Sequence, residues 1–185
     1  AFMAQDRETV DEAWPGDIVG LFDTGNLKIG DSLTDGEKAT YTGIPSFSPE
    51  IFKEVINKDA MKTKQLEKGL LQLMEEGVAQ LFTYELGKRK VVGVVGALQF
   101  EVIQFRLKNE YNATADFVPQ NIYKACWISS KNEKKLAEFI DSKQRHLARD
   151  KDDKLVFMAE SKAWLQMVQD NFPEINFHFT SEFKD

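Results

Sequence analysis

The chain has 185 residues and a formal net charge of −6 at pH 7, with ordinary apolar and charged fractions for a globular protein. Its length suffices for one large domain or two small ones. No apolar run approaches the roughly 20 residues of a membrane-spanning helix, and the N-terminus lacks a signal-peptide layout. The single cysteine, Cys126, excludes an internal disulfide. We therefore expect a cytoplasmic protein without a membrane segment. We also expect it to be a monomer.

The negative charge is confined to the N-terminal quarter of the chain. Residues 1–45 contain three basic and nine acidic side chains, whereas residues 46–185 contain 21 of each. Any contact with a polyanion must therefore come from local basic patches rather than from the overall field.

Residues 1–45 have the pattern of short β-strands separated by turns. The turn signal Pro15-Gly16-Asp17 precedes an apolar strand at residues 18–22, and residues 23–26 supply the next turn. Residues 27–29 alternate as another short strand. Because these few strands cannot close a sheet, we expect this segment to be part of a β unit completed by upstream sequence.

Residues 41–49 contain Gly43, Pro45 and Pro49 and predict a linker, with a domain boundary after residue 45. The next segment is ambiguous. Ser48, Pro49 and Glu50 are typical of a helix start, and apolar residues at 51, 52, 55 and 56 follow at helical spacing. The local signal therefore favours a helix here.

The elements that follow are clearer. Asp59 can cap a helix with an apolar stripe at 66, 70, 73 and 74, which Gly77 ends. Residues 78–86 alternate as a strand, residues 87–89 form a turn, and the valine-rich residues 91–95 predict a strand covered on both faces. A helix over residues 98–111 and an extended segment over 113–117 complete a β-α-β-β-α-β order.

The helix predicted for residues 98–111 is apolar on two sides. One stripe comprises Phe100, Ile103, Leu107 and Tyr111, and the opposite stripe comprises Leu98, Val102 and Phe105. We expect the first stripe to cover a sheet and the second to pack against another layer or domain.

A further unit begins near residue 122. Residues 122–128 and 155–158 predict strands, and helices are indicated by Leu136, Phe139, Ile140 and Leu147 and then by Trp164, Leu165 and Val168. Residues 149–154 predict a charged loop. The alternating residues 175–180 predict a last strand, so the expected order of this part is β-α-β-α-β.

Several separated motifs resemble translational GTPases. Residues 15–21 and 29–33 resemble the β-barrel that follows the G domain, and residues 96–102, 106–108 and 110–111 are similar to the next domain in the elongation factor G group. Residues 2–4, 6–7, 41–45 and the Trp127 region narrow the resemblance to the bacterial peptide chain release factor 3 family. The resemblance extends over essentially the whole chain.

This resemblance implies an α+β fold. The expected architecture is a partial translation-factor β-barrel (residues 1–45) followed by a C-terminal α+β domain (46–185). That domain would comprise a ferredoxin-like βαββαβ part (46–118) and a βαβαβ extension (119–185). The resemblance also favours a strand over residues 51–57.

No catalytic motif is visible in the sequence. The single Gly-Lys pair, Gly87-Lys88, fails the phosphate-binding pattern because Phe82 and Arg89 replace the first glycine and the hydroxyl residue. Cys126 is expected in the core, His146 near a helix C-terminus and His178 on the outside of a strand. Two distant histidines and one cysteine do not make a metal site. We expect neither catalysis nor a cofactor in these residues.

The resemblance implies a ribosome-dependent GTPase that removes stop-codon-reading release factors from the ribosome after peptide release. GTP or GDP with Mg²⁺ would bind an upstream G domain, and these residues would dock on ribosomal RNA and protein and contact that domain. Eight basic residues are candidates for ribosome contacts, although without the resemblance each set would be read as a solvated face. They are Lys62, Lys64, Lys68, Lys88, Arg89, Lys90, Arg106 and Lys108. Leu98, Val102 and Phe105 are the candidates for interdomain packing.

Two other interpretations remain open. A related elongation factor G-like or ribosome-protection factor would share the barrel and the following domain, but the segment after residue 121 disfavours it. A freestanding ferredoxin-like module that binds a ligand or a protein is disfavoured by the partial barrel.

Overall fold

The protein is described here by a computed structural model, which covers residues 10–22, 27, 31–37 and 48–181. The described residues form an α+β structure with eight strands and four α-helices. In chain order these are β1 (Ile51–Asn57), α1 (Thr63–Glu75), β2 (Gln80–Tyr84), β3 (Lys90–Val94), α2 (Leu98–Tyr111), β4 (Ala115–Pro119), β5 (Lys124–Ser129), α3 (Glu133–Lys143), β6 (Leu147–Arg149), β7 (Leu155–Ala159), α4 (Lys162–Asn171) and β8 (Asn176–His178). Short 3-10 helices at Ala60–Lys62 and Gln144–His146 precede α1 and β6.

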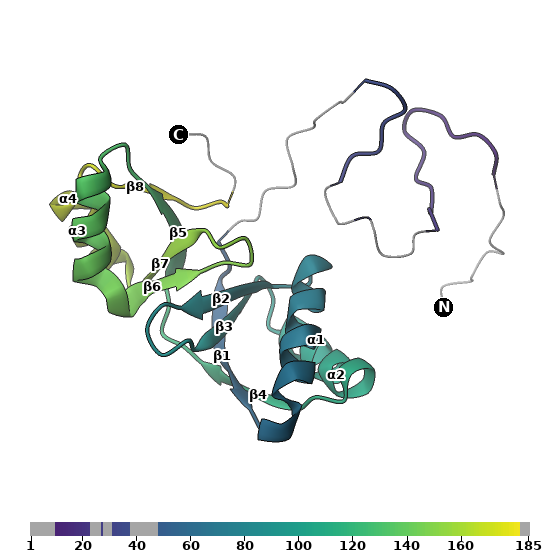
Figure 1. Cartoon of the computed structure of the whole chain (residues 1–185), viewed down its shortest axis with the longest axis horizontal. Helices are drawn as coiled ribbons and strands as arrows, with labels where there is room; N and C mark the ends of the chain where they lie inside the picture. Colours follow the sequence, from purple (N-terminus) through teal and green to yellow (C-terminus); the bar gives the residue numbers. More distant parts are fainter. Residues whose placement is uncertain (1–9, 23–26, 28–30, 38–47, 182–185) are drawn as a thin grey trace.

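All eight strands belong to one sheet in the order β4-β1-β3-β2-β6-β7-β5-β8, and every pairing is antiparallel (Figure 1). The first four strands in chain order occupy one half of the sheet, and the last four occupy the other. The two halves meet where Thr83 pairs with Arg149 and Tyr84 pairs with Ala148. The β-α-β-β-α-β order of the first half is present as expected, whereas its assignment to the ferredoxin-like fold stays a prediction.

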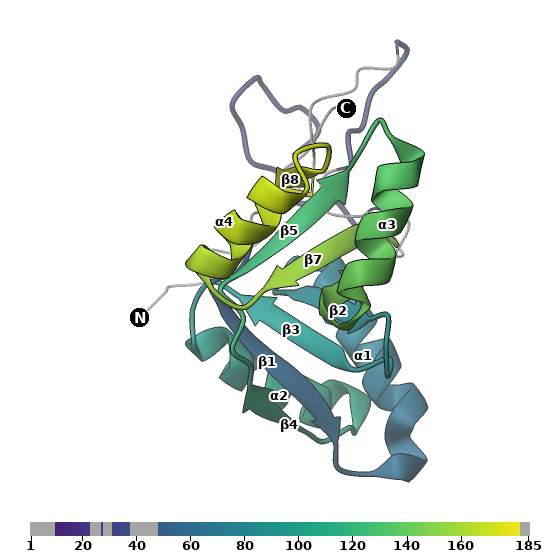
Figure 2. The same ribbon diagram turned by 90° about the vertical axis from the view of Figure 1, so that its left-hand side faces the viewer.

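Three apolar clusters hold this sheet together. The first lies between the first half of the sheet and helices α1 and α2, and the third lies between the second half and helices α3 and α4 (Figure 2). The second cluster contains side chains from the opposite faces of both halves, including Phe82, Val91, Trp127 and Val156. The sheet therefore bends so that its two helix-free faces bury each other.

Strand β1 settles the ambiguity of residues 51–57. It pairs with β3 on one side and with β4 on the other. Phe52 contributes to the second cluster, while Val55 packs against the first from the opposite face. A strand satisfies both contacts because successive side chains point to opposite faces. The strand that the family resemblance favours is confirmed.

The chain enters the sheet through a firmly held segment. The buried Ser48 accepts a hydrogen bond on its Oγ from the Ala125 N–H (3.0 Å), and its own N–H donates to the Phe179 carbonyl (2.9 Å). Pro49 packs against Gly93, where an added Cβ would lie 2.5 Å from the proline Cγ. These contacts attach the entry segment to both halves of the sheet.

The expected β-α-β-α-β extension is wrong in one element. Leu147 lies in β6 instead of continuing the preceding helix, which ends at Lys143. The three-residue strand is too short to show a period, and it forms because β2 and β7 provide hydrogen-bonding partners on both sides.

The N-terminal segment shows a turn but no strand among its described residues. The Asp17 N–H donates to the Trp14 carbonyl (2.9 Å), and Gly16 has a φ of 103°, so the turn at residues 15–17 is confirmed. The strand expected at residues 18–22 is absent, and Ile18 is fully exposed. A strand needs a partner for its backbone hydrogen bonds, and none lies beside this segment in the described structure. The expected strand at residues 27–29 falls largely outside the described residues.

Candidate functional site

Helix α2 presents one buried and one exposed apolar side, as its two-stripe pattern requires. Phe100, Ile103 and Leu107 lie in the first apolar cluster, and Tyr111 packs against it. On the outside, Leu98 is 72% exposed, Val102 49% and Phe105 69%. The expectation that the first stripe covers the sheet is confirmed. The second stripe is exposed at the surface of the described part of the chain. Its packing against another layer or domain therefore stays a prediction.

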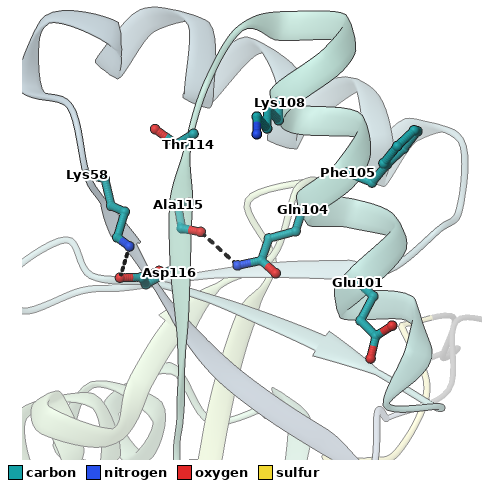
Figure 3. A pocket seen from close by; sticks show the side chains of 8 residues that line it. All are labelled: Lys58, Glu101, Gln104, Phe105, Lys108, Thr114, Ala115 and Asp116. Atoms are coloured by element: carbon teal, nitrogen blue, oxygen red, sulfur yellow. Dashed lines mark hydrogen bonds and ion pairs between the residues drawn. The ribbon is translucent and has the colours of Figure 1, made fainter.

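An open hollow lies between α2 and the edge strand β4 (Figure 3). Gln104 reaches across it and donates from Nε2 to the Ala115 carbonyl (3.1 Å). Lys58 pairs with Asp116 (2.9 Å) on the strand side, and Lys108 extends from the helix above them. The Gln104 contact and the Lys58–Asp116 pair satisfy polar groups along this edge, so the hollow lacks the convergent free groups of a small-molecule site.

The basic residues at the turn between β2 and β3 point to different partners. Lys88 is at the tip with a φ of 50° and lies 3.4 Å from Glu85. Arg89 pairs with Glu54 (3.0 Å) and lies over the Tyr84 ring, and Lys90 pairs with Glu67 on α1. Residues 89 and 90 face opposite sides of the sheet because they are adjacent in an extended segment. The three charges therefore do not form one patch.

Arg106 is held between α1 and its own helix. Its guanidinium donates to both carboxylate oxygens of Glu110 (2.7 Å each) and also binds Glu76 at the end of α1. The hydrogen bonds that Arg106 donates to Glu110 and then to Glu76 raise the pKa of Arg106, and its guanidinium lowers the pKa of Glu110. This arrangement makes Arg106 a link between two helices.

The remaining basic candidates differ in how freely they can move. Lys62 donates to Asn112 Oδ1 (3.0 Å), which connects the start of α1 to the end of α2. Lys64 and Lys68 are exposed and lie one helical turn apart on α1, and Lys108 is exposed on α2. Within the described residues these last three have no ion-pair partner, so they can approach a phosphate without losing an existing contact.

Groups that could perform chemistry are dispersed. Cys126 is fully buried in β5, and burial raises the pKa of its thiol to about 12. His146 is near Glu160 (3.2 Å), and His178 hydrogen-bonds Ser129 Oγ (3.0 Å) instead of being merely solvated. The described residues contain no group of three or more histidine, cysteine, aspartate or glutamate side chains that could hold a metal ion. No helix in this part of the chain has the length and hydropathy to cross a membrane.

Comparison with protein-family models identifies the family to which most of this chain is similar. Residues 41–169 match the family model described as class II release factor RF3, C-terminal domain, and this range runs from before β1 into α4. The chain belongs to this release-factor family. Residues 1–36 match a second model, described as elongation factor G domain 2. Both belong to translation factors of the GTPase class, so the resemblance to release factor 3 found in the sequence is confirmed.

The family assignment fits the lack of a phosphate-binding loop in these 185 residues. Lys88 belongs to the single Gly-Lys pair of the sequence and lies in the turn between β2 and β3, so a strand rather than a helix follows it.

Sequence reasoning missed two residues beside these surfaces. The sequence predicts that Val95 belongs to a strand, but it follows the end of β3, is 67% exposed, and donates its N–H to Gln99 Oε1 (3.0 Å). Lys53 projects from β1 over the Phe100 ring, 4.3 Å from its centroid. The sequence carried no signal for this contact. Lys53 and Phe100 are far apart in the chain, and they meet only because β1 pairs with β3, which directly precedes α2.

Proposed function

We propose that this chain is the ribosome-docking and coupling part of a release-factor GTPase. In this proposal the whole protein promotes the dissociation of stop-codon-reading release factors from the ribosome after peptide release. GTP or GDP with Mg²⁺ binds a G domain that these 185 residues do not contain. The observation that carries the proposal is the match of residues 41–169 to the release factor C-terminal domain.

The distribution of ion pairs supports particular contacts with ribosomal RNA. Arg89, Lys90 and Arg106 already bind carboxylates, so a phosphate would have to compete for them. Lys64, Lys68 and Lys108 have exposed, unpaired ammonium groups in the described structure. Phosphate contacts of this kind position a protein without reading bases. We assign the leading docking contacts to these three lysines, with Lys88 and Lys62 as secondary ones.

The test is sedimentation of the intact factor with ribosomes over a range of salt concentrations. Replacing Lys64, Lys68 and Lys108 together by alanine should weaken binding at every salt concentration. It should also reduce the slope of log K against log salt by roughly two to three, since each lost phosphate contact contributes about one. The expected loss is electrostatic, so it should diminish at high salt.

The matched control replaces three other exposed lysines, Lys131, Lys134 and Lys162, in the second half of the sheet domain. Both variants lose three positive charges, so a general charge effect would weaken them equally. Equal slopes for the two variants would remove the three leading lysines from the docking surface. If the intact factor fails to sediment with ribosomes at all, the proposed function itself is wrong.

An elongation factor G-like role is the second candidate, favoured by the match of residues 1–36 alone. The two roles differ in their substrate complexes. The proposed role predicts that the intact factor speeds the release of a stop-codon-reading factor from ribosomes after peptide release, whereas the alternative predicts faster translocation.

A further inference from the structure

Residues 48–50 bind both halves of the sheet at the point where the chain enters it, and we call them the entry clamp. The Oγ of Ser48 accepts a hydrogen bond from the Ala125 N–H (3.0 Å) in the second half. Two residues later, the Glu50 N–H donates to the Val94 carbonyl (3.0 Å) in the first half. The starts of β1 and β5 and the end of β3 lie close together at this point (Figure 2). The clamp therefore joins the two halves within a span of three residues.

The hydroxyl of Ser48 is a costly group to bury. Ser48 is the only buried polar residue in the described part of the chain, with 8% of its surface exposed. A buried hydroxyl destabilises a protein unless it is hydrogen-bonded, whereas an alanine would occupy nearly the same space without that cost. Ala125 is fully buried beyond the last residue pair of β5 and β8, and its N–H finds its acceptor in this hydroxyl. The serine therefore serves the contact with the second half.

Pro49 makes the clamp stiff. A proline ring fixes φ of its own residue, and steric contact with the ring restricts the preceding residue to extended conformations. The ring lies against the backbone of β3, because a Cβ added at Gly93 would lie 2.5 Å from Pro49 Cγ and 2.8 Å from Pro49 Cβ. Ser48 and Glu50 are therefore held in one relative geometry, and a displacement of Ser48 reaches β3 through the proline.

The clamp adds an attachment far from the junction of β2 with β6. At that junction Thr83 pairs with Arg149, and Thr83 also pairs with Lys90 at the start of β3. The clamp instead binds Val94 at the end of β3. At about 3.3 Å per residue, the two points are about 13 Å apart along this strand. Two attachments at this separation prevent the halves of the sheet from turning about either one.

We propose that the entry clamp transmits movement of the preceding part of the chain to both halves of the sheet at once, with Ser48 as its positioning residue. Residues 1–36 and 41–169 match two different family models, so the clamp follows closely after the change from one to the other. A pull on residue 48 loads β5 through the hydroxyl and β3 through Pro49 and Glu50. This inference deepens the proposed coupling role and rests on it for the activity measurement, whereas the exchange measurement needs no ribosome.

Hydrogen exchange in the 185-residue chain tests whether the clamp opens as one unit. Ser48→Ala removes the acceptor of the Ala125 N–H and leaves the acceptor of the Glu50 N–H in place. We nevertheless expect both amides to exchange about tenfold faster than in the natural chain, as loss of a buried hydrogen bond predicts. Each rate is taken relative to that of the Val92 amide in the core of β3, which reports global unfolding. Ser48→Thr keeps the hydroxyl and should keep both amides protected.

Ser130→Ala is the matched control. Ser130 Oγ also accepts a backbone N–H, that of Asn132 (3.1 Å), and donates to a backbone carbonyl, that of Glu174 (2.8 Å), but all of these groups belong to the second half. This variant should leave the relative exchange of the clamp amides unchanged. Two results would overturn the proposal. Faster exchange of Ala125 alone in Ser48→Ala would show a local contact, and equal changes in the two variants would show an unspecific effect.

Pro49→Ala gives an independent test that does not depend on the stability of Ser48→Ala. It keeps the Ser48 hydroxyl and removes the ring that lies against β3. Because the clamp acts as one unit in the proposal, the amides of Glu50 and Ala125 should again exchange faster together. Faster exchange of Glu50 alone would contradict the proposal.

The activity of the intact factor separates this inference from the proposed function. Ser48→Ala should lower the rate at which saturating factor releases a stop-codon-reading factor from ribosomes, and Ser48→Thr should restore it. Sedimentation with ribosomes should stay unchanged, because Ser48 is buried and offers no docking contact. A natural factor that sediments with ribosomes but does not speed the release would refute the proposed function and leave the exchange result valid. In an active factor, an unchanged maximal rate for Ser48→Ala would refute the clamp.

Discussion

At the scale of single residues, burial sets the chemistry of Cys126. Its side chain lies in the third apolar cluster, and burial raises the pKa of its thiol from about 9 to about 12. The unfolded chain therefore releases this proton at lower pH than the folded chain. It follows that the contribution of Cys126 to stability is constant below pH 9 and decreases as the pH rises from 9 to 12.

This sign gives a measurable prediction. Between pH 8 and pH 10, the free energy of unfolding of the natural chain should fall relative to that of Cys126→Ala by about 1.4 kcal/mol, the value of one pKa unit. The comparison removes the titration of all other groups, and the cavity left by alanine does not depend on pH. Urea unfolding at both pH values provides the measurement. A difference between the two proteins that does not change with pH would show that the thiol titrates normally in the folded state.

Residue-scale predictions from the sequence succeeded where a side chain acts alone and were incomplete where it acts through a partner. The turn at Pro15-Gly16-Asp17 and the buried Cys126 follow from local pattern and residue type. The pairing of Lys90 with Glu67, 23 positions away, depends on the packing of α1 beside β3. No spacing rule along the sequence could have shown which basic residues already have a partner.

At the scale of elements, the approach of α1 to α2 depends on the absence of a side chain at Gly69. A Cβ at this position would lie 2.8 Å from Leu107 Cδ2 and 2.8 Å from Tyr111 Cγ. Alanine favours a helix by about 1 kcal/mol over glycine, but overpacking in a tight contact costs about 1–3 kcal/mol. We therefore expect Gly69→Ala to lower the free energy of unfolding by about 1 kcal/mol.

Chemical denaturation of Gly69→Ala tests this expectation, and Gln72→Ala is the matched control. Gln72 is exposed on the same helix, so its replacement should change stability little. Stabilisation by Gly69→Ala, as at an exposed helical glycine, would mean that the two helices are farther apart than the structure shows.

The elements that the sequence predicts best are those with a long period. Helix α2 has the predicted bounds, because 14 residues display two apolar stripes clearly. Strand β1 carried apolar residues at helical spacing, and only its two partner strands decide its conformation. Strand β6 has three residues and was not predicted, since pairing with β2 and β7, rather than local pattern, forms it.

At the scale of the whole molecule, the continuity of the sheet makes its two halves mutually dependent. The Glu85 N–H donates to the Leu147 carbonyl (2.9 Å), and the Arg149 guanidinium pairs with Glu85 (2.6 Å) at the β2–β6 junction. In the second apolar cluster, Phe82 of the first half contacts Trp127 of the second, with ring centroids 6.2 Å apart. The sequence predicts two parts that meet near residue 118, and side chains from both parts contribute to this shared core. The core arises from strand pairings between residues too distant in sequence to predict.

The shared core predicts that residues 48–181 unfold in one cooperative transition. Phe139 belongs to α3 and is fully buried in the third cluster, which contains no residue of α1 or α2. Phe139→Leu should cost about 1–2 kcal/mol, as other shape changes in a packed core do. In a cooperative unit, hydrogen exchange of the β1 and β3 amides should accelerate by the factor that corresponds to the same free energy, although no substitution lies near them. A change in exchange limited to β5, β7 and β8 would show that the two halves of the sheet unfold independently. The sheet would then not provide the rigid connection that the proposed coupling role requires.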